Sequence, residues 1–416
     1  MLTREGGRQE RAVPVSLVRG LMVWGPGLLV MLADADAGNI VTAADAGARW
    51  DYRLLPLTLL LIPMLYLVQE LTVRLGIHTK RGHAELIRER FGFGWAAFAV
   101  AGLAAASIGS LVTEFTGVAG IGEMFGVSRA FTLPLAAAAL LAIVGAGAYR
   151  RIERLALAVG LFELAFFAVA WTAHPGLRTM ARAAIDLPLD DPGFLYMAAA
   201  IIGATFNPWM IFYQQSATVD KELKPADLAH ARLDTALGAI LTQCLTGAVL
   251  VAAAATLATS GSEGLGSVGT ISAALTPTLG ETAGRILFGA GVLGASLVAA
   301  IVASLALAWG VGEMAGYRRT LEMRPFAAGW FYASYALTTG GSAAAVWAAS
   351  DLVWLNIAAQ VLNVFLMPLT IGFLIALTAT ALPEPHRISR ARFRAIIAMS
   401  ALVSVAGLWG GLRGIF

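Results

Sequence analysis

Two carboxylates and a carboxamide interrupt a long apolar segment near the start of this chain. Asp34, Asp36 and Asn39 fall within a largely apolar stretch that covers positions 21–48. A charged side chain at bilayer depth costs at least ~2.5–3.5 kcal/mol, so such groups are seldom present without a function. Gly38 weakens the helix at the same place, and a weakened helix frees backbone carbonyls. Carboxylate, carboxamide and carbonyl oxygens are the ligands that hard divalent cations prefer, so the segment predicts a broken membrane helix that binds a metal ion in transit.

The composition is that of an integral membrane protein. Of the 416 residues, 58% are hydrophobic and 13% are charged, whereas soluble proteins carry roughly 25% charged residues. The single cysteine, Cys244, excludes a disulfide framework, and none of the five histidines lies in the apolar centre of a segment. The net charge of +3 comes from loops and does not indicate a nucleic-acid partner. We expect a divalent cation and the lipid bilayer as partners, no cofactor and no obligate protein partner.

Hydropathy predicts about eleven transmembrane helices in an all-α protein. A span needs about 20 apolar residues, and the candidates are 20–45, 54–75, 95–125, 131–149, 152–173, 194–219, 236–259, 283–311, 326–347, 351–380 and 393–412. With a cytoplasmic N-terminus, 22 of the 29 Lys and Arg residues fall on the inner side, as the positive-inside rule requires. We therefore expect a multi-pass protein of the cell membrane whose C-terminus lies outside.

The first and sixth spans share a helix-breaking centre. Ala37-Gly38-Asn39 interrupts the first, and the stretch from Gly203 through Thr205 and Asn207 to Pro208 interrupts the sixth. Spans one and six are equivalent members of two five-helix halves, and paired interrupted segments indicate the substrate site of a transporter. The predicted organisation is a cytoplasmic tail at 1–19, repeats at 20–173 and 194–380 in inverted orientation, and an extra helix at 393–412.

With these segments in view, the chain resembles the Nramp family of divalent-metal transporters, and the resemblance covers nearly all of it. It rests on fragments in the family's order: Asp36-Ala37-Gly38-Asn39 where the family has Asp-Pro-Gly-Asn, then Ile40-Val41-Thr42, Ala46-Gly47-Ala48, the segment from Arg74 to Lys80, and Gln360-Val361-Leu362-Asn363 followed by Pro368. The resemblance implies a LeuT-like fold of five plus five helices with broken helices one and six.

Several positions depart from the family's pattern. Asn207 stands where the family has a methionine that helps to select soft transition metals, and an amide oxygen favours a harder ion. Trp209 and Gln214 stand where the family has histidines tied to proton movement, and neither carries a proton at neutral pH. Of the family's Asp-x-x-Glu pair only Glu114 remains, because Leu111 takes the other position. These departures resemble the Nramp-related magnesium transporters.

The predicted ligands each have a structural alternative. Asp36 and Asn39 are expected to bind the cation, and the alternative for both is to cap the second half of the broken helix. Asn207 is expected to line the site, or else to cap the helix that restarts at Pro208. The resemblance implies that Ala33 and Ala204 lend backbone carbonyls to the cation.

Other polar residues near the breaks keep two interpretations. Asp34 either pairs with an Arg or Lys or lines the cavity, because residues two apart do not face the same way on a regular helix. Glu114 is a remnant of the proton route or a buried structural acid that lines the cavity. Gln360 reaches the cation or packs between helices. Thr205, Trp209 and Gln214 are expected to line the cavity.

The leading hypothesis is a transporter that takes up largely hydrated Mg²⁺ by alternating access without proton coupling. The alternative is a proton-coupled Mn²⁺ or Fe²⁺ transporter of the Nramp type. An amino-acid transporter on the same scaffold is disfavoured because Asp36 would repel a substrate carboxylate. An intramembrane hydrolase is disfavoured because the second catalytic aspartate motif is missing.

Overall fold

The structure is a computed structural model, and it describes residues 25–145, 158, 164–172, 176–257, 268–275, 280–317 and 329–416. These residues form helices and connecting turns, without a β-strand in the described ranges. The helices are α2 (Pro26–Asp34), α3 (Ala37–Trp50), α4 (Leu55–Thr79), α5 (His83–Phe91), α6 (Phe93–Met124), α7 (Arg129–Gly145), α9 (Ala165–Thr172), α10 (Leu177–Ala183), α11 (Pro192–Thr205), α12 (Pro208–Asp220), α13 (Leu228–Leu257), α14 (Val268–Leu275), α15 (Glu281–Ala315), α16 (Gly329–Ala348), α17 (Leu352–Thr380) and α18 (Arg390–Ile415), with 3-10 turns at Pro225–Asp227 and Glu384–His386.

Most predicted spans coincide with one of these helices. Within the described residues, seven segments are long and apolar enough to cross a membrane, and the bent pair α2 and α3 makes an eighth. α7 and α16 lie at two further predicted spans, 131–149 and 326–347, without meeting the same length and hydropathy criteria. Most of the predicted span 152–173 and the predicted tail 1–19 lie outside the described residues.

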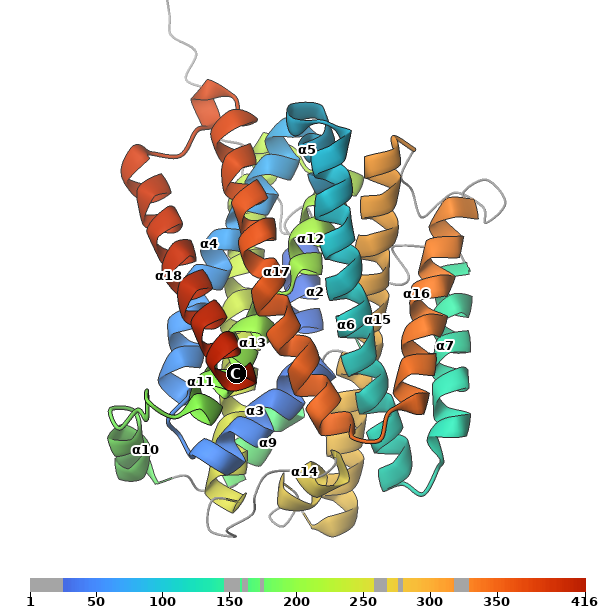
Figure 1. Ribbon diagram of the computed structural model, residues 1–416, viewed down its shortest axis with the longest axis vertical. Coiled ribbons are helices and arrows are strands. Elements are labelled where there is room, and N and C mark those ends of the chain that lie inside the picture. The colour runs from blue at the N-terminus through green and yellow to red at the C-terminus, as the bar shows by residue number, and fades with distance from the viewer. Residues whose placement is uncertain are drawn as a thin grey trace, which may run out of the picture.

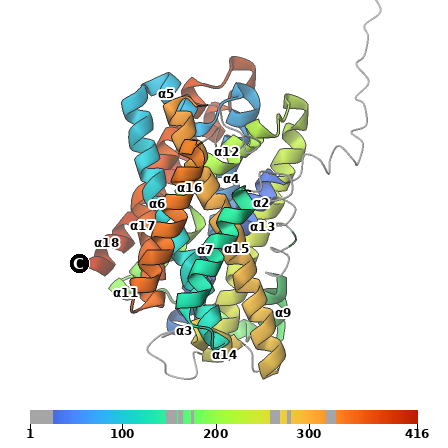
Figure 2. The same ribbon diagram turned by 90° about the vertical axis from the view of Figure 1, so that its right-hand side faces the viewer.

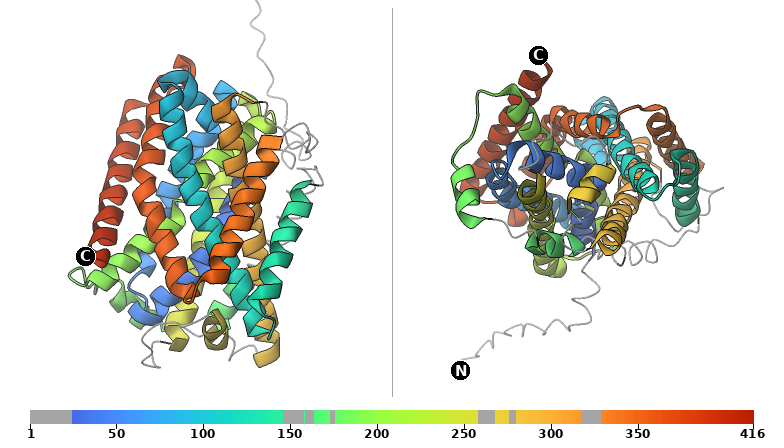
Figure 3. Two further views of the ribbon diagram at one scale, coloured as in Figure 1. Left: turned by 45° about the vertical axis from the view of Figure 1, so that its right-hand side comes forward. Right: turned by 90° about the horizontal axis from the view of Figure 1, so that it is seen from below.

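The helices form a bundle in which the two broken spans are surrounded (Figure 1). α13 packs against α2, α3 and α4, while α6 packs against α15 and α17. α18 lies on the outside against α11 and α17. α7 and α16 pack together at the opposite edge of the bundle (Figure 2). Seen from below, the short helices α10 and α14 lie at the end of the bundle away from α5 (Figure 3).

Ionic and polar contacts tie the helices together at the α5 end. The buried Glu70 carboxylate of α4 lies 2.5 Å from a nitrogen of Arg74, 3.2 Å from one of Arg232 and 3.2 Å from one of Arg392. These arginines come from α4, α13 and α18, so one acid links three helices. Nearby, Asp234 of α13 accepts a hydrogen bond from the backbone amide of Gly27 at 2.8 Å, which fixes the start of α2.

The positively charged stretch after the second predicted span, for which no helix is predicted from the sequence, forms the helix α5. The helix begins after Gly82 and buries Ala84 and Ile87 against the bundle. The backbone amide of Ala84 donates to the buried Glu313 carboxylate of α15 at 3.1 Å. A nine-residue helix with charges on its outer face has no hydropathy signal of its own, so it depends on this tertiary packing.

Candidate metal site at the two helix breaks

The first broken span divides at Ala35 and Asp36, and its halves α2 and α3 meet at 46°. Asp36 is the N-cap of α3, because its Oδ1 accepts the backbone amide of Asn39 at 2.6 Å. The amide of Ala37 would close a turn onto the Ala33 carbonyl in a continuous helix, but it donates instead to Glu114 Oε2 at 3.2 Å. The span therefore breaks without the proline of the family pattern, because two carboxylates take up the freed amides.

The second broken span divides at Phe206 and Asn207, between α11 and α12. Pro208 has no amide hydrogen, so the Ala204 carbonyl lacks its usual partner four residues on. That carbonyl accepts a hydrogen bond from Asn207 Nδ2 at 2.9 Å. Asn207 is the N-cap residue of α12, but its side chain makes no capping bond there.

The two breaks meet through Asp34 and Asn207. Asn207 Nδ2 also donates to Asp34 Oδ1 at 3.2 Å, across 173 positions of sequence. Asp34 and Asp36 are both fully buried, with 0% of their surface exposed. No Arg or Lys of the described residues forms an ion pair with Asp34, so the ion-pair alternative for this residue is not found among them.

Two carboxylate oxygens at the breaks receive no hydrogen bond. Asp34 Oδ2 and Asp36 Oδ2 are buried and have no donor in the described part of the chain. Glu114, whose Oε2 accepts the Ala37 amide, adds another buried acceptor beside them and not a donor when it is ionised. Buried charges are normally paired or coordinate a metal, so these oxygens fit a bound cation.

α17 brings two amide side chains to the breaks. Asn363 Nδ2 donates to Asn207 Oδ1 and, at 3.1 Å, to Gln360 Oε1. Gln360 Nε2 is buried without a partner and lies against Gly38, where an added Cβ would overlap it and would also lie 3.0 Å from Asp36 Oδ1. Asn363 entered the sequence analysis only as part of the family resemblance. The available signal was a Gln and an Asn three residues apart on one face of an apolar helix.

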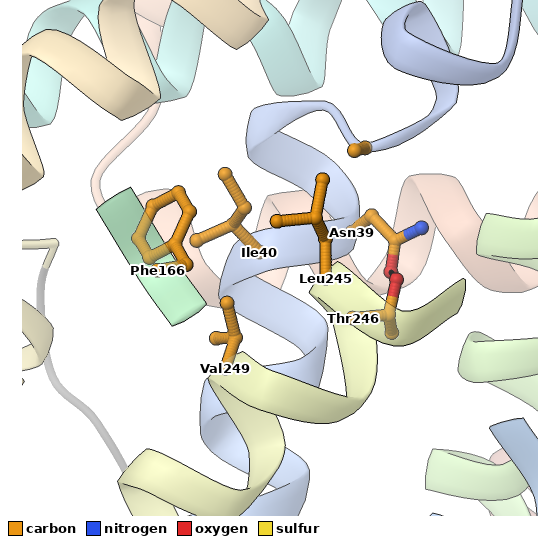
Figure 4. A pocket seen from close by; sticks show the side chains of 7 residues that line it. Asn39, Ile40, Phe166, Leu245, Thr246 and Val249 are labelled. Atoms are coloured by element: carbon orange, nitrogen blue, oxygen red, sulfur yellow. Dashed lines mark hydrogen bonds between the residues drawn. The ribbon is translucent and has the colours of Figure 1, made fainter. Parts of the chain in front are cut away.

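Asn39 is held between the break and α13. Its Nδ2 donates to the Asp34 carbonyl at 3.0 Å, and its Oδ1 accepts from Thr246 Oγ1 at 3.1 Å. Figure 4 shows Asn39 and Thr246 pointing toward each other beside a small pocket. The pocket is lined further by Ala35, Ile40, Phe166, Leu245 and Val249. A second small pocket, next to Asn207, lies between α4, α12 and α17.

The other residues predicted to line the cavity, Thr205, Trp209 and Gln214, lie on α11 and α12. Thr205 Oγ1 accepts from Gln243 Nε2 of α13 at 3.2 Å. Trp209 is fully buried, and its Nε1 donates to Ser110 Oγ of α6 at 2.9 Å. Gln214 lies two turns into α12, where it bonds threonines of α4 and α13 and has no recorded contact with the carboxylates.

The donor set at the breaks consists of oxygens and amides. The described residues contain no group of three His, Cys, Asp or Glu side chains that could hold a metal ion by themselves. A site here would combine the carboxylates of Asp34 and Asp36 with amide and carbonyl oxygens and with water. Carboxylate, carbonyl and water ligands suit Mg²⁺, Ca²⁺ and Mn²⁺.

Comparison with known proteins agrees with this geometry. The family described as "Natural resistance-associated macrophage protein-like", Nramp, matches residues 27–412. The chain belongs to the Nramp family. It is therefore a membrane transporter and not an enzyme, and the expected absence of a hydrolase centre agrees with this membership.

Relatives and solved structures extend the comparison. The divalent metal cation transporter MntH of Brucella suis is 27% identical over 307 residues, which cover 69% of this chain and 66% of that protein. The chain thus spans about two thirds of that relative's length. The manganese transporter of Eremococcus coleocola superposes with a TM-score of 0.78 at 18% identity, over 97% of this chain and 89% of that one. MhsT in complex with L-phenylalanine superposes with a TM-score of 0.61 at 16% identity, over 98% of this chain and 100% of that one. These likenesses support the predicted LeuT-like fold of five plus five helices.

Proposed function

We propose that this Nramp protein carries a divalent metal cation across the cell membrane by alternating access, with Mn²⁺ as its first candidate substrate. The observation that carries the proposal is a pair of buried carboxylate oxygens where the two broken spans meet, Asp34 Oδ2 and Asp36 Oδ2, which have no donor among the described residues. A buried, unpaired carboxylate is costly, and a divalent cation offsets that cost. Interrupted helices in corresponding positions of two inverted repeats are where secondary transporters bind their substrates.

Mn²⁺ comes first because of the relatives and because of the ligands. The relatives named above are a divalent metal cation transporter and a manganese transporter. An all-oxygen site accommodates Mn²⁺ as well as Mg²⁺. A transition-metal transporter of the Nramp type, the alternative hypothesis from the sequence, is therefore better supported than the leading hypothesis of a magnesium transporter.

One contact favours proton coupling for this function. Glu114 Oε2 accepts the backbone amide of Ala37, the residue after Asp36, so a second buried carboxyl group lies beside the proposed ligand. A cation bound at Asp36 would favour the ionised form of this neighbouring carboxyl group, so Glu114 would release a proton when the cation binds. Glu114 is then part of a proton route, one of the two interpretations that the sequence allowed.

Mg²⁺ without proton coupling is the second candidate, and the chemistry of the second break favours it. Asn207 brings a carboxamide and no thioether to the site. Trp209 and Gln214 are engaged in buried hydrogen bonds to neutral side chains and are not basic. Mg²⁺ keeps several of its waters and needs only one or two carboxylates, which this site offers.

We also propose the orientation and domain division expected from the sequence. The Glu70 cluster and α5 would lie on the cytoplasmic side, where Lys and Arg accumulate. The first repeat would cover 20–173, the second 194–380, and α18 would follow as the extra helix. With this orientation the membrane potential supplies ~4.6 kcal/mol per 100 mV for entry of a divalent cation, twice the value for a unit charge.

Uptake into proteoliposomes that enclose a pH indicator distinguishes the candidates. For a proton-coupled Mn²⁺ transporter we expect Mn²⁺ uptake with internal acidification, and little loss of uptake in about 100-fold excess Mg²⁺. For the second candidate we expect Mg²⁺ uptake that a negative internal potential drives, without acidification. Protein-free liposomes provide the background, and uptake of neither cation above that background would contradict the proposed function.

A further inference from the structure

We propose that Asp34 is a second carboxylate ligand of the transported cation, and that Asn207 and Asn363 are positioning residues that hold it. The inference rests on the proposed function, because it assigns ligands to the same cation. Asp34 lies at the first helix break of this chain, and the sequence leaves two interpretations of it open, an ion pair or a place in the cavity lining.

The surroundings of Asp34 are those of a ligand that awaits a cation. Its side chain is fully buried, its Oδ1 accepts one hydrogen bond, from Asn207, and its Oδ2 accepts none. Within the described ranges no Lys or Arg forms an ion pair with it. A buried carboxylate with one neutral donor is poorly compensated, so a structural role alone does not account for it.

The break places Asp34 and Asp36 in one site although they are two residues apart. On a continuous helix these side chains would point about 200° apart around the axis. Here Asp34 is the last residue of α2 and Asp36 is the N-cap of α3, and the two halves meet at 46°. Both also lie beside amides of α17, because Asp34 Oδ1 bonds Asn207, which bonds Asn363, and Gln360 Nε2 lies against Gly38 next to Asp36.

A chain of amides explains how Asp34 is oriented. Asn207 Nδ2 donates to Asp34 Oδ1 and to the Ala204 carbonyl, and Asn207 Oδ1 accepts from Asn363 Nδ2. The oxygen of Asn207 is thus engaged by α17, and its nitrogen faces the carboxylate. In this arrangement Asn207 lines the site and serves it through Asp34, because its side-chain oxygen is already engaged by Asn363.

Two carboxylates give the site a charge that matches a divalent cation. The bound cation would be neutralised by Asp34 and Asp36, whereas a monovalent cation would leave one negative charge buried. Because the two ligands belong to different half-helices, the cation would also join α2 to α3. Binding should therefore raise the unfolding temperature of the protein, since only the folded state holds both ligands together.

The test compares Mn²⁺ binding to the full-length, detergent-purified protein with its Asp34→Asn and Asp36→Asn variants by isothermal titration calorimetry. Asparagine keeps the shape and removes the charge. We expect both variants to bind Mn²⁺ at least about tenfold more weakly, and to lose most of the Mn²⁺-induced rise in unfolding temperature. Asp45→Asn is the matched control, because Asp45 is an equally buried acid of α3 that pairs with Arg49, 2.8 Å away. Its Mn²⁺ affinity should stay within about twofold of the wild type.

Without metal, Asp34→Asn should unfold at the same temperature as the wild type or higher, because it removes an uncompensated buried charge. Asp34→Glu keeps a carboxylate and should bind Mn²⁺ more tightly than Asp34→Asn. If Asp34→Asn bound Mn²⁺ with wild-type affinity, or failed to fold, the inference would be overturned. The proposed function would stay intact in that case if Asp36→Asn still lost Mn²⁺ binding. A wild-type protein that binds neither Mn²⁺ nor Mg²⁺ would contradict the proposed function itself.

Discussion

The close approach of α11 and α17 beside the site depends on a glycine. Gly203 lies in the last turn of α11, and a Cβ added there would overlap the carbonyl group of Gln360. The nearest side-chain atom, a methyl carbon of Val364, would lie 3.0 Å away. Because the overlapping atom belongs to the backbone of α17, no side-chain rotation relieves the clash, and Gly203→Ala must move one helix.

The size of the effect follows from two opposing contributions. Overpacking a tight interface by one methyl group costs about 1–3 kcal/mol. Alanine is favoured over glycine by about 1 kcal/mol in a helix interior. Because a backbone atom is the obstacle, the steric contribution should exceed the gain in helix propensity. We expect Gly203→Ala to lower the free energy of unfolding by up to about 2 kcal/mol, and to weaken Mn²⁺ binding because Gln360 also contacts Gly38 beside Asp36.

Equilibrium unfolding in mixed detergent micelles, followed by circular dichroism, measures this change. Gly372→Ala is the control, since Gly372 lies in α17, is exposed, and has no atom within 4 Å of the added Cβ. The control variant should be as stable as the wild type, or up to about 1 kcal/mol more stable. If Gly203→Ala matched the control in stability and in Mn²⁺ affinity, the proposed close contact at the second break would be refuted.

Two further predictions concern the α5 end of the bundle. Glu70→Gln should lower the free energy of unfolding by about 1–3 kcal/mol, because three partly exposed arginines lose their shared partner. The surface variant Glu89→Gln should change it by less than about 0.5 kcal/mol. Equal losses in the two variants would contradict the role of Glu70 in linking the helices. Burial lowers the pKa of the His83 imidazole to about 4, below its usual value of 6.5, so the unfolded state binds the proton more tightly. The free energy of unfolding should therefore fall by up to about 3 kcal/mol as the pH drops from 6.5 to 4. In His83→Gln, whose neutral amide can still face Gln215, the free energy of unfolding should depend less on pH over this range. An unchanged pH dependence in this variant would refute the assignment.

The predictions that succeeded rest on strong local signals. The spans followed from apolar segments of membrane length, since the bilayer leaves few alternatives for such segments. The second break followed from Pro208, which removes an amide hydrogen. The first break was predicted too, but its position, Ala37-Gly38-Asn39, was wrong: it occurs at Ala35 and Asp36, because Asp36 caps α3 and Glu114 takes the Ala37 amide.

The features that sequence reasoning missed depend on contacts between distant helices. The contact of Asp34 with Asn207 joins positions 173 residues apart, and that of Asn39 with Thr246 joins positions 207 apart. Periodicity along one helix carries no information on which helix lies opposite. For the same reason the short helix α5 and the part that Asn363 plays beside Asn207 could be recognised only in the folded arrangement.

The central claim is that the two breaks bind the cation that the protein transports, with Asp36 as an essential ligand. The most direct test is Mn²⁺ uptake into proteoliposomes that contain either the wild-type protein or Asp36→Asn, reconstituted in equal amounts and in a matched orientation. We predict uptake well above that of protein-free liposomes for the wild type, and uptake at that background for Asp36→Asn. Equal uptake by the two proteins would contradict the claim, because the cation would then cross without the carboxylate at the first break.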